Sequence, residues 1–319
     1  MIEVQGLTKR YGNIEAVKDV SFSLGRDQVL GFLGPNGAGK TTIMKIITGF
    51  HFPSGGSVFV EGVSVQEDPV EVKKRIGYLP ESVPLYGDLT VEEYLSFIAA
   101  ARLIPGKEQK KAMGAALSSC GLEQVRGRQI ETLSKGYKQR VGLAQAIIHD
   151  PAILILDEPT SGLDPNQIIE IRSLIKELGK RKTVILSTHI LQEVEAVCSR
   201  VLIINEGRIA AQGTPEEIAG TMKGGDTWEL VLKGPAGPGE LLSRLKGLGE
   251  DLGSPAAEGR GDGTLDVSFF IPGEEGGALG NGERIFDWAL SSGYKILGMN
   301  RKKLSLEDIF VKLTSEAKE

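Results

Sequence analysis

The chain has 319 residues, of which 40% are hydrophobic and 25% are charged, a balance typical of folded domains and not of disordered chains. Its 37 basic and 42 acidic residues give a net charge of −5. This balance argues against nucleic acid as a partner, because contact with a phosphate backbone requires a basic surface. With no apolar run near the roughly 18–20 residues of a membrane span, no apolar leader and only two cysteines, we expect a soluble cytoplasmic α/β protein.

Glycine divides the chain into two parts. Of the 42 glycines, 18 lie between residues 224 and 298, where an even distribution would place about ten. The length also suits about two domains of roughly 100–200 residues each. We therefore predict a larger domain over residues 1–222 and a smaller one over residues 226–319, separated at the Gly224-Gly225 pair.

The first part alternates strand-like and helical patterns. Runs rich in Val, Ile, Leu and Phe predict strands at 17–24, 29–33, 76–79, 153–156, 184–187 and 201–204. Helices are predicted at 41–48, at 108–119, from the capping box at Thr90 to about 102, from the N-cap Ser134 to about 149, after Asp164-Pro165 and after Thr214. Buried strands that alternate with helices indicate a parallel sheet covered on both faces.

The second part shows weaker patterns. Strands are predicted at 228–232, 265–271 and 294–299, and helices at 240–248, at 283–291 and after the capping sequence that starts at Ser305. The glycine-rich stretches 253–263 and 273–282 are predicted to be loops. A small βαβαβα domain fits this order, and Trp228 and Trp288 are expected in its core.

Residues 34–41 read Gly-Pro-Asn-Gly-Ala-Gly-Lys-Thr, which matches the phosphate-binding pattern G-x-x-x-x-G-K-[ST]. The pattern follows a predicted strand and opens a predicted helix, which is the setting that it requires. Successive backbone N–H groups and the helix N-terminus then form a concave anion site. Lys40 is expected to reach the β- and γ-phosphates and the Thr41 hydroxyl to ligate Mg²⁺. The alternative is a chance glycine-rich turn.

The apolar strand 153–156 ends in two acids, Asp157 and Glu158. In an open parallel sheet, ligands bind beyond the carboxyl ends of the strands. Asp157 is then expected to face the Mg²⁺, and Glu158 to orient or deprotonate the attacking water. Without the glycine loop, two ordinary carboxylates at a solvated strand end would be the better interpretation.

Three further segments carry a family resemblance. Residues 133–140, Leu-Ser-Lys-Gly-Tyr-Lys-Gln-Arg, resemble the signature of ABC transporter ATPases, whose usual form is LSGGQ. Residues 157–164 resemble their Walker B motif and D-loop, and residues 187–189, Ser-Thr-His, resemble their switch-histidine segment. Tyr11 stands where the family stacks an aromatic ring on adenine. The motifs follow the family's order and cover residues 1 to about 220.

The resemblance implies a P-loop NTPase fold of the ABC ATPase type, with a helical subdomain at about 88–148 and a small α+β C-terminal domain. In the family, two ATPase domains enclose two ATP molecules, each held by the glycine loop of one chain and the signature of the other. One loop and one signature per chain make a homodimer the simplest assembly. The implied ATP contacts are Tyr11, Gly34, Pro35, Asn36, Gly37, Ala38, Gly39, Lys40, Thr41, Thr42, Glu81, Ser134, Lys135, Gly136 and Asp164; the implied Mg²⁺ contacts are Thr41, Asp157 and Glu81; the implied catalytic residues are Glu158, His189 and Lys40.

The sequence departs from the family's usual pattern at three positions. Lys135 and Tyr137 replace the usual glycine and glutamine of the signature, and Glu81 replaces the usual glutamine of its loop. Lys135 either adds positive charge beside the phosphate or is a solvated side chain. Glu81 either acts near Mg²⁺, directly or through water, or only faces solvent. His189, taken alone, would be a satisfied histidine at a helix start; the resemblance implies that it contacts the γ-phosphate.

These departures, the sequence Pro84-Leu85-Tyr86 and the ending at residues 306–314 resemble the ABC-2 type exporter branch, which includes multidrug and gliding-motility-type ATPases. The resemblance implies an ATPase subunit, peripheral on the inner face of the cell membrane, that powers separate transmembrane permease subunits. The permease is expected to dock near Glu81 and the segment 90–121. The alternatives are a soluble ABC ATPase of DNA repair, translation or complex assembly, and a regulatory module whose C-terminal domain senses a ligand. The cargo is not given by the sequence.

Overall fold

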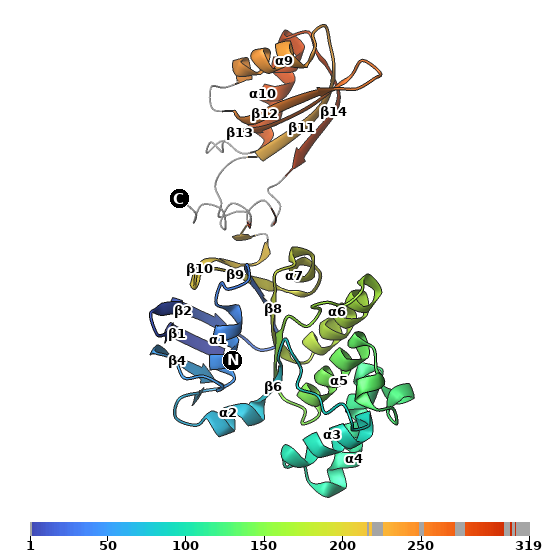
Figure 1. The fold of residues 1–319 in the computed structure, drawn as a ribbon. Helices are drawn as coiled ribbons and strands as arrows, with labels where there is room; N and C mark the ends of the chain where they lie inside the picture. Colours follow the sequence, from blue (N-terminus) through green and yellow to red (C-terminus); the bar gives the residue numbers. More distant parts are fainter. Residues whose placement is uncertain are drawn as a thin grey trace. The chain divides into compact units, whose positions relative to one another are not determined.

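A computed structural model describes residues 2–215, 217–218, 226–248, 252–271, 278–302, 307 and 310. These residues divide into two compact units, the first over residues 2–215 and the second within residues 216–312 (Figure 1). The predicted capping sequence at Ser305 and most of the helix predicted after Thr214 lie outside the described residues. So does the ending at 306–314, apart from Glu307 and Phe310.

The first unit is built on a six-stranded sheet with the strand order β10-β9-β3-β8-β7-β6. Its strands are β3 (Val29–Leu33), β6 (Ile76–Leu79), β7 (Ile153–Asp157), β8 (Thr183–Thr188), β9 (Arg200–Asn205) and β10 (Arg208–Gly213). Five of these strands run parallel, and β10 pairs antiparallel with β9 at one edge. Every residue of β3, β7 and β8 is buried, which is the expected property of a parallel sheet with both faces covered.

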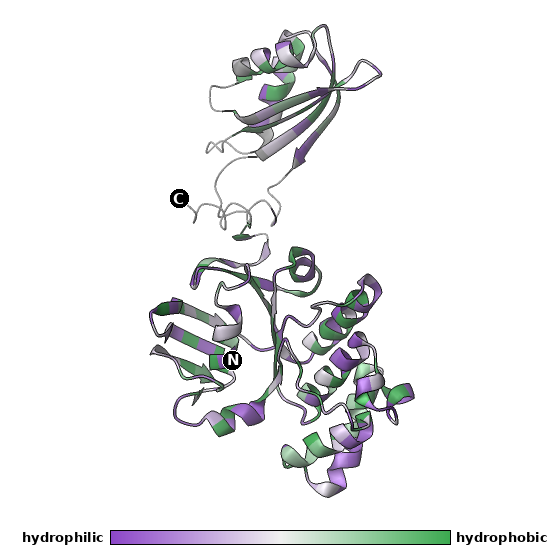
Figure 2. Cartoon of the chain, viewed as in Figure 1, coloured by the Kyte–Doolittle hydropathy of each residue, from purple (hydrophilic) through white to green (hydrophobic). Residues whose placement is uncertain are grey.

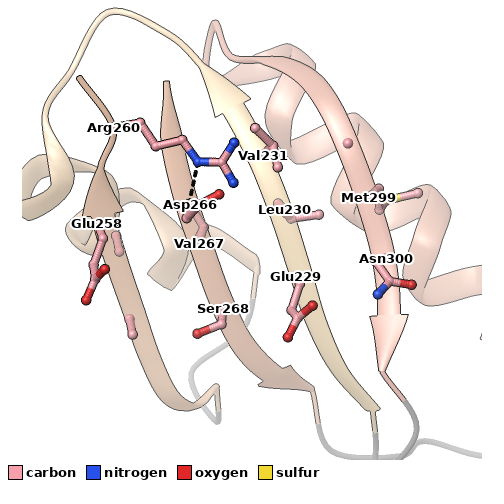
Figure 3. A pocket seen from close by; sticks show the side chains of 13 residues that line it. Glu229, Leu230, Val231, Glu258, Arg260, Asp266, Val267, Ser268, Met299 and Asn300 are labelled. Carbon is pink, nitrogen blue, oxygen red and sulfur yellow. Dashed lines mark hydrogen bonds and ion pairs between the residues drawn. The ribbon is translucent and has the colours of Figure 1, made fainter. Parts of the chain in front are cut away.

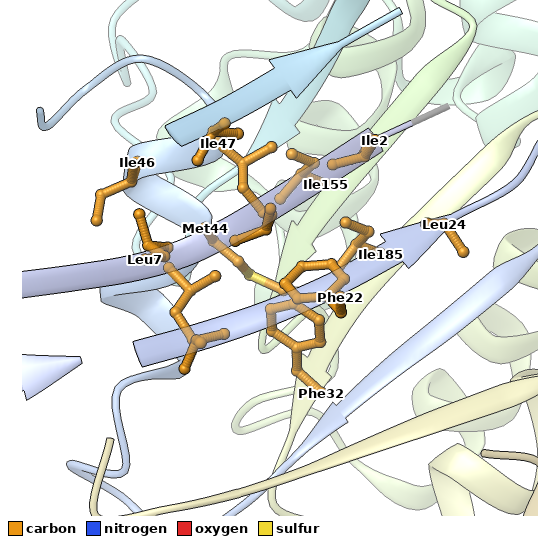
Figure 4. Close-up of a cluster of buried hydrophobic side chains, with 14 of the residues drawn as sticks. Ile2, Leu7, Phe22, Leu24, Phe32, Met44, Ile46, Ile47, Ile155 and Ile185 are labelled. Carbon is orange, nitrogen blue, oxygen red and sulfur yellow. The ribbon is translucent and has the colours of Figure 1, made fainter. Parts of the chain in front are cut away.

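A smaller antiparallel sheet has the order β2-β1-β4-β5, and its strands are β1 (Ile2–Tyr11), β2 (Ile14–Leu24), β4 (Gly55–Val60) and β5 (Val63–Ser64). One cluster of buried side chains joins this sheet, helix α1 (Lys40–Ile47) and the central sheet (Figure 4). Within it, the rings of Phe22 and Phe32 pack edge to face with their centroids 5.5 Å apart. This core fixes α1, and therefore the loop that precedes it, against the end of the central sheet.

Helices follow the strands of the first unit. They are α2 (Pro69–Arg75), α3 (Val91–Ala101), α4 (Gly106–Cys120), α5 (Lys135–Ile147), α6 (Pro165–Gly179) and α7 (Leu191–Val197), with short 3₁₀ turns at Glu123–Val125 and Ile130–Thr132. Helices α3, α4 and α5 contact one another. Hydrophobic and hydrophilic residues alternate around α5 and α6 (Figure 2), as in helices that bury one face.

The helix starts predicted at Thr90, Ser134 and Asp164 are confirmed. Thr90 Oγ1 accepts a hydrogen bond from the Glu93 backbone N–H, and the Glu93 side chain accepts one from the Thr90 backbone N–H, which completes the capping box of α3. Ser134 caps α5 and Asp164 caps α6, each through a side-chain oxygen that accepts a backbone N–H. These caps orient the two helix N-termini that carry the signature-like and D-loop-like segments.

The second unit has the element order β11 (Asp226–Lys233), α9 (Pro238–Leu245), a 3₁₀ turn (Lys246–Leu248), β12 (Gly253–Gly259), β13 (Leu265–Ile271), α10 (Ala278–Ser291) and β14 (Lys295–Lys302). Its paired strands are antiparallel and have the order β12-β13-β11-β14. A β-α-β-β-α-β chain with this strand order is a ferredoxin-like fold, or split βαβ arrangement.

The predicted βαβαβα order is wrong because it lacks one strand. Residues 253–263 were expected to form a loop, but Gly253–Gly259 forms β12, where Ala256 and Ala257 pair with Ser268 and Val267 of β13. The segment has no alternation of large apolar and polar residues, so only its pairing with β13 identifies it as a strand. The loop expected over 273–282 is likewise too long, because α10 begins at Ala278; residues 273–277 lie outside the described part.

The two faces of the second unit's sheet differ in character. One face packs against α9 and α10 in a core that includes Trp228, Phe269 and Trp288, so the predicted core positions of both tryptophans are confirmed. The other face forms a hollow of about 650 Å³, where the Arg260 guanidinium pairs with the Asp266 carboxylate at 2.6 Å (Figure 3). The polar groups on this face are surface side chains that solvent reaches.

Among the described residues, no helix has the length and apolar character that crossing a membrane requires.

His149, in the turn after α5, is a histidine whose protonation opposes folding. The His149 Nε2–H donates to the Ile76 carbonyl oxygen at 3.2 Å, whereas Nδ1 is buried and has no hydrogen-bond partner. Burial, with a smaller contribution from the positive charge of Arg102, lowers the pKa of His149 to about 4. Since an unfolded histidine titrates near 6.5, the unfolded chain takes up this proton first as the pH falls.

We therefore predict that the free energy of unfolding decreases as the pH falls from about 6.5 towards 4, and that His149 supplies part of this decrease. His149→Gln keeps an N–H donor for the Ile76 carbonyl and removes the titration, so its stability should depend less on pH over that window. Urea denaturation of both proteins at pH 7 and pH 5 measures the difference. The same loss of stability in both proteins would show that His149 does not contribute.

Candidate functional site

The phosphate-binding sequence forms a tightly packed loop between β3 and α1. Residues 36–42, together with Ala16, Glu81 and Glu158, line a pocket of about 260 Å³. A Cβ atom at Gly39, whose φ is 106°, would lie 2.6 Å from the Ala16 carbonyl oxygen, so only glycine fits there. The loop is also tied to the β9–β10 turn, because the Gly207 N–H donates to the Ala38 carbonyl oxygen at 3.0 Å.

Lys40 begins α1 and lies across this loop. Its buried Nζ donates hydrogen bonds to the carbonyl oxygens of Gly34 at 2.7 Å and Pro35 at 3.2 Å, and lies 3.6 Å from Glu158 Oε1. Burial lowers the pKa of Lys40, and the negative charges of Glu158 and Asp157 oppose that effect. The loop therefore holds a desolvated ammonium group beside the backbone N–H groups of a helix start, which is an environment that favours a polyanion.

A hydroxyl and a carboxylate meet at the same end of the sheet. Thr41 Oγ1 donates to Asp157 Oδ1 at 3.1 Å, and Ser187 Oγ donates to the same oxygen at 2.6 Å. Ser187 Oγ in turn accepts the Glu158 backbone N–H at 2.9 Å. Asp157 is 1% exposed, so these hydrogen bonds compensate the desolvation of its charge. Oxygen donors of this kind are the ligands that Mg²⁺ prefers.

Glu158 lies between Lys40 and His189. Its Oε2 is 2.9 Å from His189 Nδ1, while its buried Oε1 has no hydrogen-bond partner. The backbone φ of Glu158 is 47°, an uncommon value for a residue with a side chain. Strained backbone of this kind concentrates at functional sites. One carboxylate oxygen is thus hydrogen-bonded to His189, and the other is paired with the Lys40 ammonium without a hydrogen bond.

The predicted site residues fall into two groups. The structure brings together residues 34–42, Glu81, Asp157, Glu158 and His189 at one end of the sheet. Ser134, Lys135 and Gly136 lie instead at the start of α5, and Asp164 caps α6. Tyr11 ends β1, 43% exposed, with its ring 6.0 Å from that of His51.

The α5 and α6 starts lie against each other. A Cβ atom added at Gly136 would lie 2.6 Å from the Gln167 side chain, and the Lys135 ammonium rests against Gly162. Lys135 is exposed in this structure, so both interpretations of that residue stay open.

Two contributors to the pocket were not assigned a role from the sequence. Ala16 forms part of its wall, and Ser187 holds Asp157 and Glu158 together. Ala16 acts through its backbone and carries no sequence signal. Ser187 could have been found from its place at the end of a strand next to β7, because the pairing of Asp157 with Ser187 puts both at the same sheet edge.

Comparison with known proteins gives a consistent result. Residues 17–161 match the sequence profile of the ABC transporter family. An uncharacterized ABC transporter ATP-binding protein of Synechocystis sp. is 35% identical over 306 residues, which cover 95% of this chain and 79% of that protein. The Nod factor export ATP-binding protein I of Ralstonia nicotianae is 36% identical over 263 residues, which cover 79% of this chain and 80% of that protein.

Solved structures agree with the sequence relatives. A dimeric structure of the ATP-binding cassette MJ0796, in a post-hydrolysis state bound to ADP and Pi, is 25% identical, has a TM-score of 0.62 and covers 67% of this chain and 98% of that chain. The predicted fold class, a P-loop NTPase of the ABC ATPase type, is therefore confirmed. Since the first relative covers almost the whole chain at more than 30% identity, the chain belongs to the ABC transporter ATP-binding proteins, the ATP-hydrolysing subunits of ABC transporters.

Proposed function

We propose that this chain is the ATPase subunit of a membrane exporter and that two copies close on two ATP molecules during each cycle. The observation that carries the proposal is the meeting of Lys40, Thr41 and Glu158 in one pocket at the carboxyl end of the parallel strands, where Thr41 is hydrogen-bonded to Asp157. An open parallel sheet binds its ligands at this end, beyond the carboxyl ends of its strands.

The loop and Lys40 would bind the β- and γ-phosphates. Lys40 Nζ now donates to two backbone carbonyls, and phosphate oxygens would offer it full negative charges at the same place. The Thr41 hydroxyl and Asp157, with Glu81 in the lining of the same pocket as Thr41, fit a Mg²⁺ ion through their oxygen donors. Mg²⁺ bound there would neutralise charge that develops on the phosphates.

Glu158 is suited to act as the general base. A base must present an acceptor oxygen towards the nucleophile, and Glu158 Oε1 is the oxygen without a hydrogen-bond partner. The contact of His189 with Oε2 holds the carboxylate in one orientation. The Lys40 ammonium lies 3.6 Å from Oε1 and places a positive charge beside the carboxylate.

The homodimer would complete the site. Ser134 and Gly136 lie at the N-terminus of α5, whose dipole and backbone N–H groups favour a phosphate. They do not line the pocket of their own chain, so a second copy would have to supply them to the first. The dimeric form of the MJ0796 cassette supports such an assembly.

Transport would require separate transmembrane subunits, and the chain would lie on the cytoplasmic face of the membrane against them. The export role of the Ralstonia relative supports the direction of transport. Near Glu81, the side chains of Tyr86 and Phe97 are 53% and 49% exposed, with their rings 5.6 Å apart. An exposed aromatic pair of this kind supports docking of the permease there. The soluble alternative is not favoured, because the relatives bear the names of transporter subunits.

We predict that Glu158→Gln retains ATP binding and slows hydrolysis by ~10²-fold or more, because the amide cannot accept the proton of water. ATP should then hold the variant as a dimer, which size-exclusion chromatography with and without ATP measures. Glu177→Gln, an exposed change on α6, is the matched control and should turn over ATP as the unmodified chain does. Normal turnover by Glu158→Gln would remove Glu158 from the catalytic role.

We predict that Glu81→Ala raises the Mg²⁺ concentration for half-maximal ATPase activity, on the order of 10-fold if the carboxylate acts beside the ion. Glu81→Gln, which installs the residue usual in the family, separates the effect of the charge from that of the side chain's length. Glu67→Ala, another exposed glutamate, serves as the control. If Mg²⁺ titrations and transport are unchanged in Glu81→Ala, the solvated interpretation of Glu81 is correct.

We predict that a tagged chain, isolated from detergent-solubilised membranes of its own host, copurifies with a polytopic membrane protein. Tyr86→Ala combined with Phe97→Ala should reduce the yield of that protein by roughly 10-fold, since exposed aromatic anchors carry much of an interface's binding energy. ATPase activity of the purified chain is the control for folding. Copurification with ribosomes or DNA in place of a membrane protein would favour the soluble alternative.

A further inference from the structure

A buried carboxylate joins the loop after Glu158 to the strand end before His189. Glu193, on α7, is 2% exposed. Its Oε1 accepts a hydrogen bond from Thr160 Oγ1 at 2.6 Å, and its Oε2 accepts one from Thr188 Oγ1 at 2.7 Å. Thr160 lies two residues after Glu158 and Thr188 directly precedes His189. Each oxygen of one side chain therefore holds a different segment of the candidate active site.

The groups around Glu193 compensate its buried charge but do not remove the free-energy cost of burying it. Arg172 of α6 has its guanidinium 3.5 Å from Glu193 Oε1, which is longer than a good hydrogen bond. The buried Arg172 Nε has no hydrogen-bond partner, so this residue contributes charge more than directed bonding. The two threonine hydroxyls supply the short, charge-assisted bonds. An apolar side chain would fill the same space without the cost of burying a charge, so packing alone does not account for a glutamate here.

Both threonines also organise the turns around them. Thr188 Oγ1 accepts the Ile190 N–H at 3.0 Å, which fixes the backbone on the far side of His189. The Thr160 carbonyl oxygen accepts the Leu163 N–H at 3.2 Å, within the turn that leads to the α6 cap. A shift of Glu193 would therefore displace both the D-loop-like segment and the histidine segment.

We propose that Glu193 is a positioning residue for ATP hydrolysis, which holds Thr160 and Thr188 at a fixed separation and so keeps Glu158 and His189 in contact. The inference rests on the proposed roles of Glu158 and His189. It adds a link between the segment carrying the general base and the segment carrying the histidine, made by a residue that touches neither of their side chains.

The test removes each hydrogen bond separately. Thr160→Val and Thr188→Val replace a hydroxyl by a methyl of similar size, and Glu193→Gln keeps the shape while removing the charge. Glu195→Gln, an exposed acid on the same helix, is the matched control. Steady-state ATPase kinetics give kcat and KM for each full-length variant, and thermal melting reports whether it folds.

We expect each of the three buried changes to lower kcat by roughly 10- to 100-fold, because small misplacements of a catalytic group have effects of that size, with the KM for ATP changed less than about 3-fold. In a Glu158→Gln background the same changes should have little further effect on the residual rate, because they act through Glu158. Glu195→Gln should leave kcat unchanged.

Unchanged kcat in folded Thr160→Val and Thr188→Val proteins would overturn the proposal, as would equal effects with and without the Glu158 carboxylate. If Glu193→Gln does not fold, the two valine variants still decide the question. Loss of turnover in Glu158→Gln with normal turnover in the valine variants would reject this inference and leave the proposed function in place. Normal turnover in Glu158→Gln itself would reject the proposed catalytic role instead.

Discussion

The ammonium group of Lys40 is the charge around which the rest of the site is arranged. Burial lowers the pKa of Lys40, and the charge of Glu158 opposes that effect. The ammonium group also donates hydrogen bonds to the carbonyl oxygens of Gly34 and Pro35. The oxygens of a bound triphosphate would be stronger hydrogen-bond acceptors for this ammonium group than the backbone carbonyls, since phosphate oxygens carry more charge. The groups that hold the Lys40 ammonium in place therefore also prepare the pocket for an anion. Its requirement for glycine follows from the same packing, because the loop must pass close to the Ala16 carbonyl to bring Lys40 into position.

Strand register converts three distant sequence segments into one site. Strand β8 lies between β3 and β7, with Leu33 opposite Thr188 and Asp157 opposite Ser187. The three strands therefore end at the same level, and the side chains that follow them meet without any long loop. The strands β3, β7 and β8 are buried on both faces, so a slip of one strand would disrupt its side-chain packing against both covering layers. The stability of the whole core therefore maintains the geometry of Thr41, Asp157 and Glu158.

Much of this site follows from local sequence, and the rest does not. The glycine loop, the acidic strand end and the caps at Thr90, Ser134 and Asp164 are local patterns whose physical meaning is contained within about ten residues, and the structure has them where they are predicted. Strand β12 is different, because Gly-Ser-Pro-Ala-Ala-Glu-Gly becomes a strand only through its partner β13. Glu193 could not be identified from local sequence either. A glutamate in a short helix is interpreted as a solvated residue, and only tertiary folding brings Thr160 and Thr188 beside it.

A chain of hydrogen bonds extends from the pocket into the body of the first unit. Ser187 links Asp157 to the backbone of Glu158. Glu193 links Thr160, two residues after Glu158, to Thr188, directly after Ser187. Because these bonds are buried, breaking one leaves a desolvated polar group, and the structure resists partial rearrangement. The groups proposed to contact nucleotide would then respond together to the presence of a γ-phosphate, not one at a time. Such a response suits a subunit that must convert a change at one phosphate into movement of a whole surface. Coupling between two sites of a protein requires an element with discrete arrangements that both sites influence.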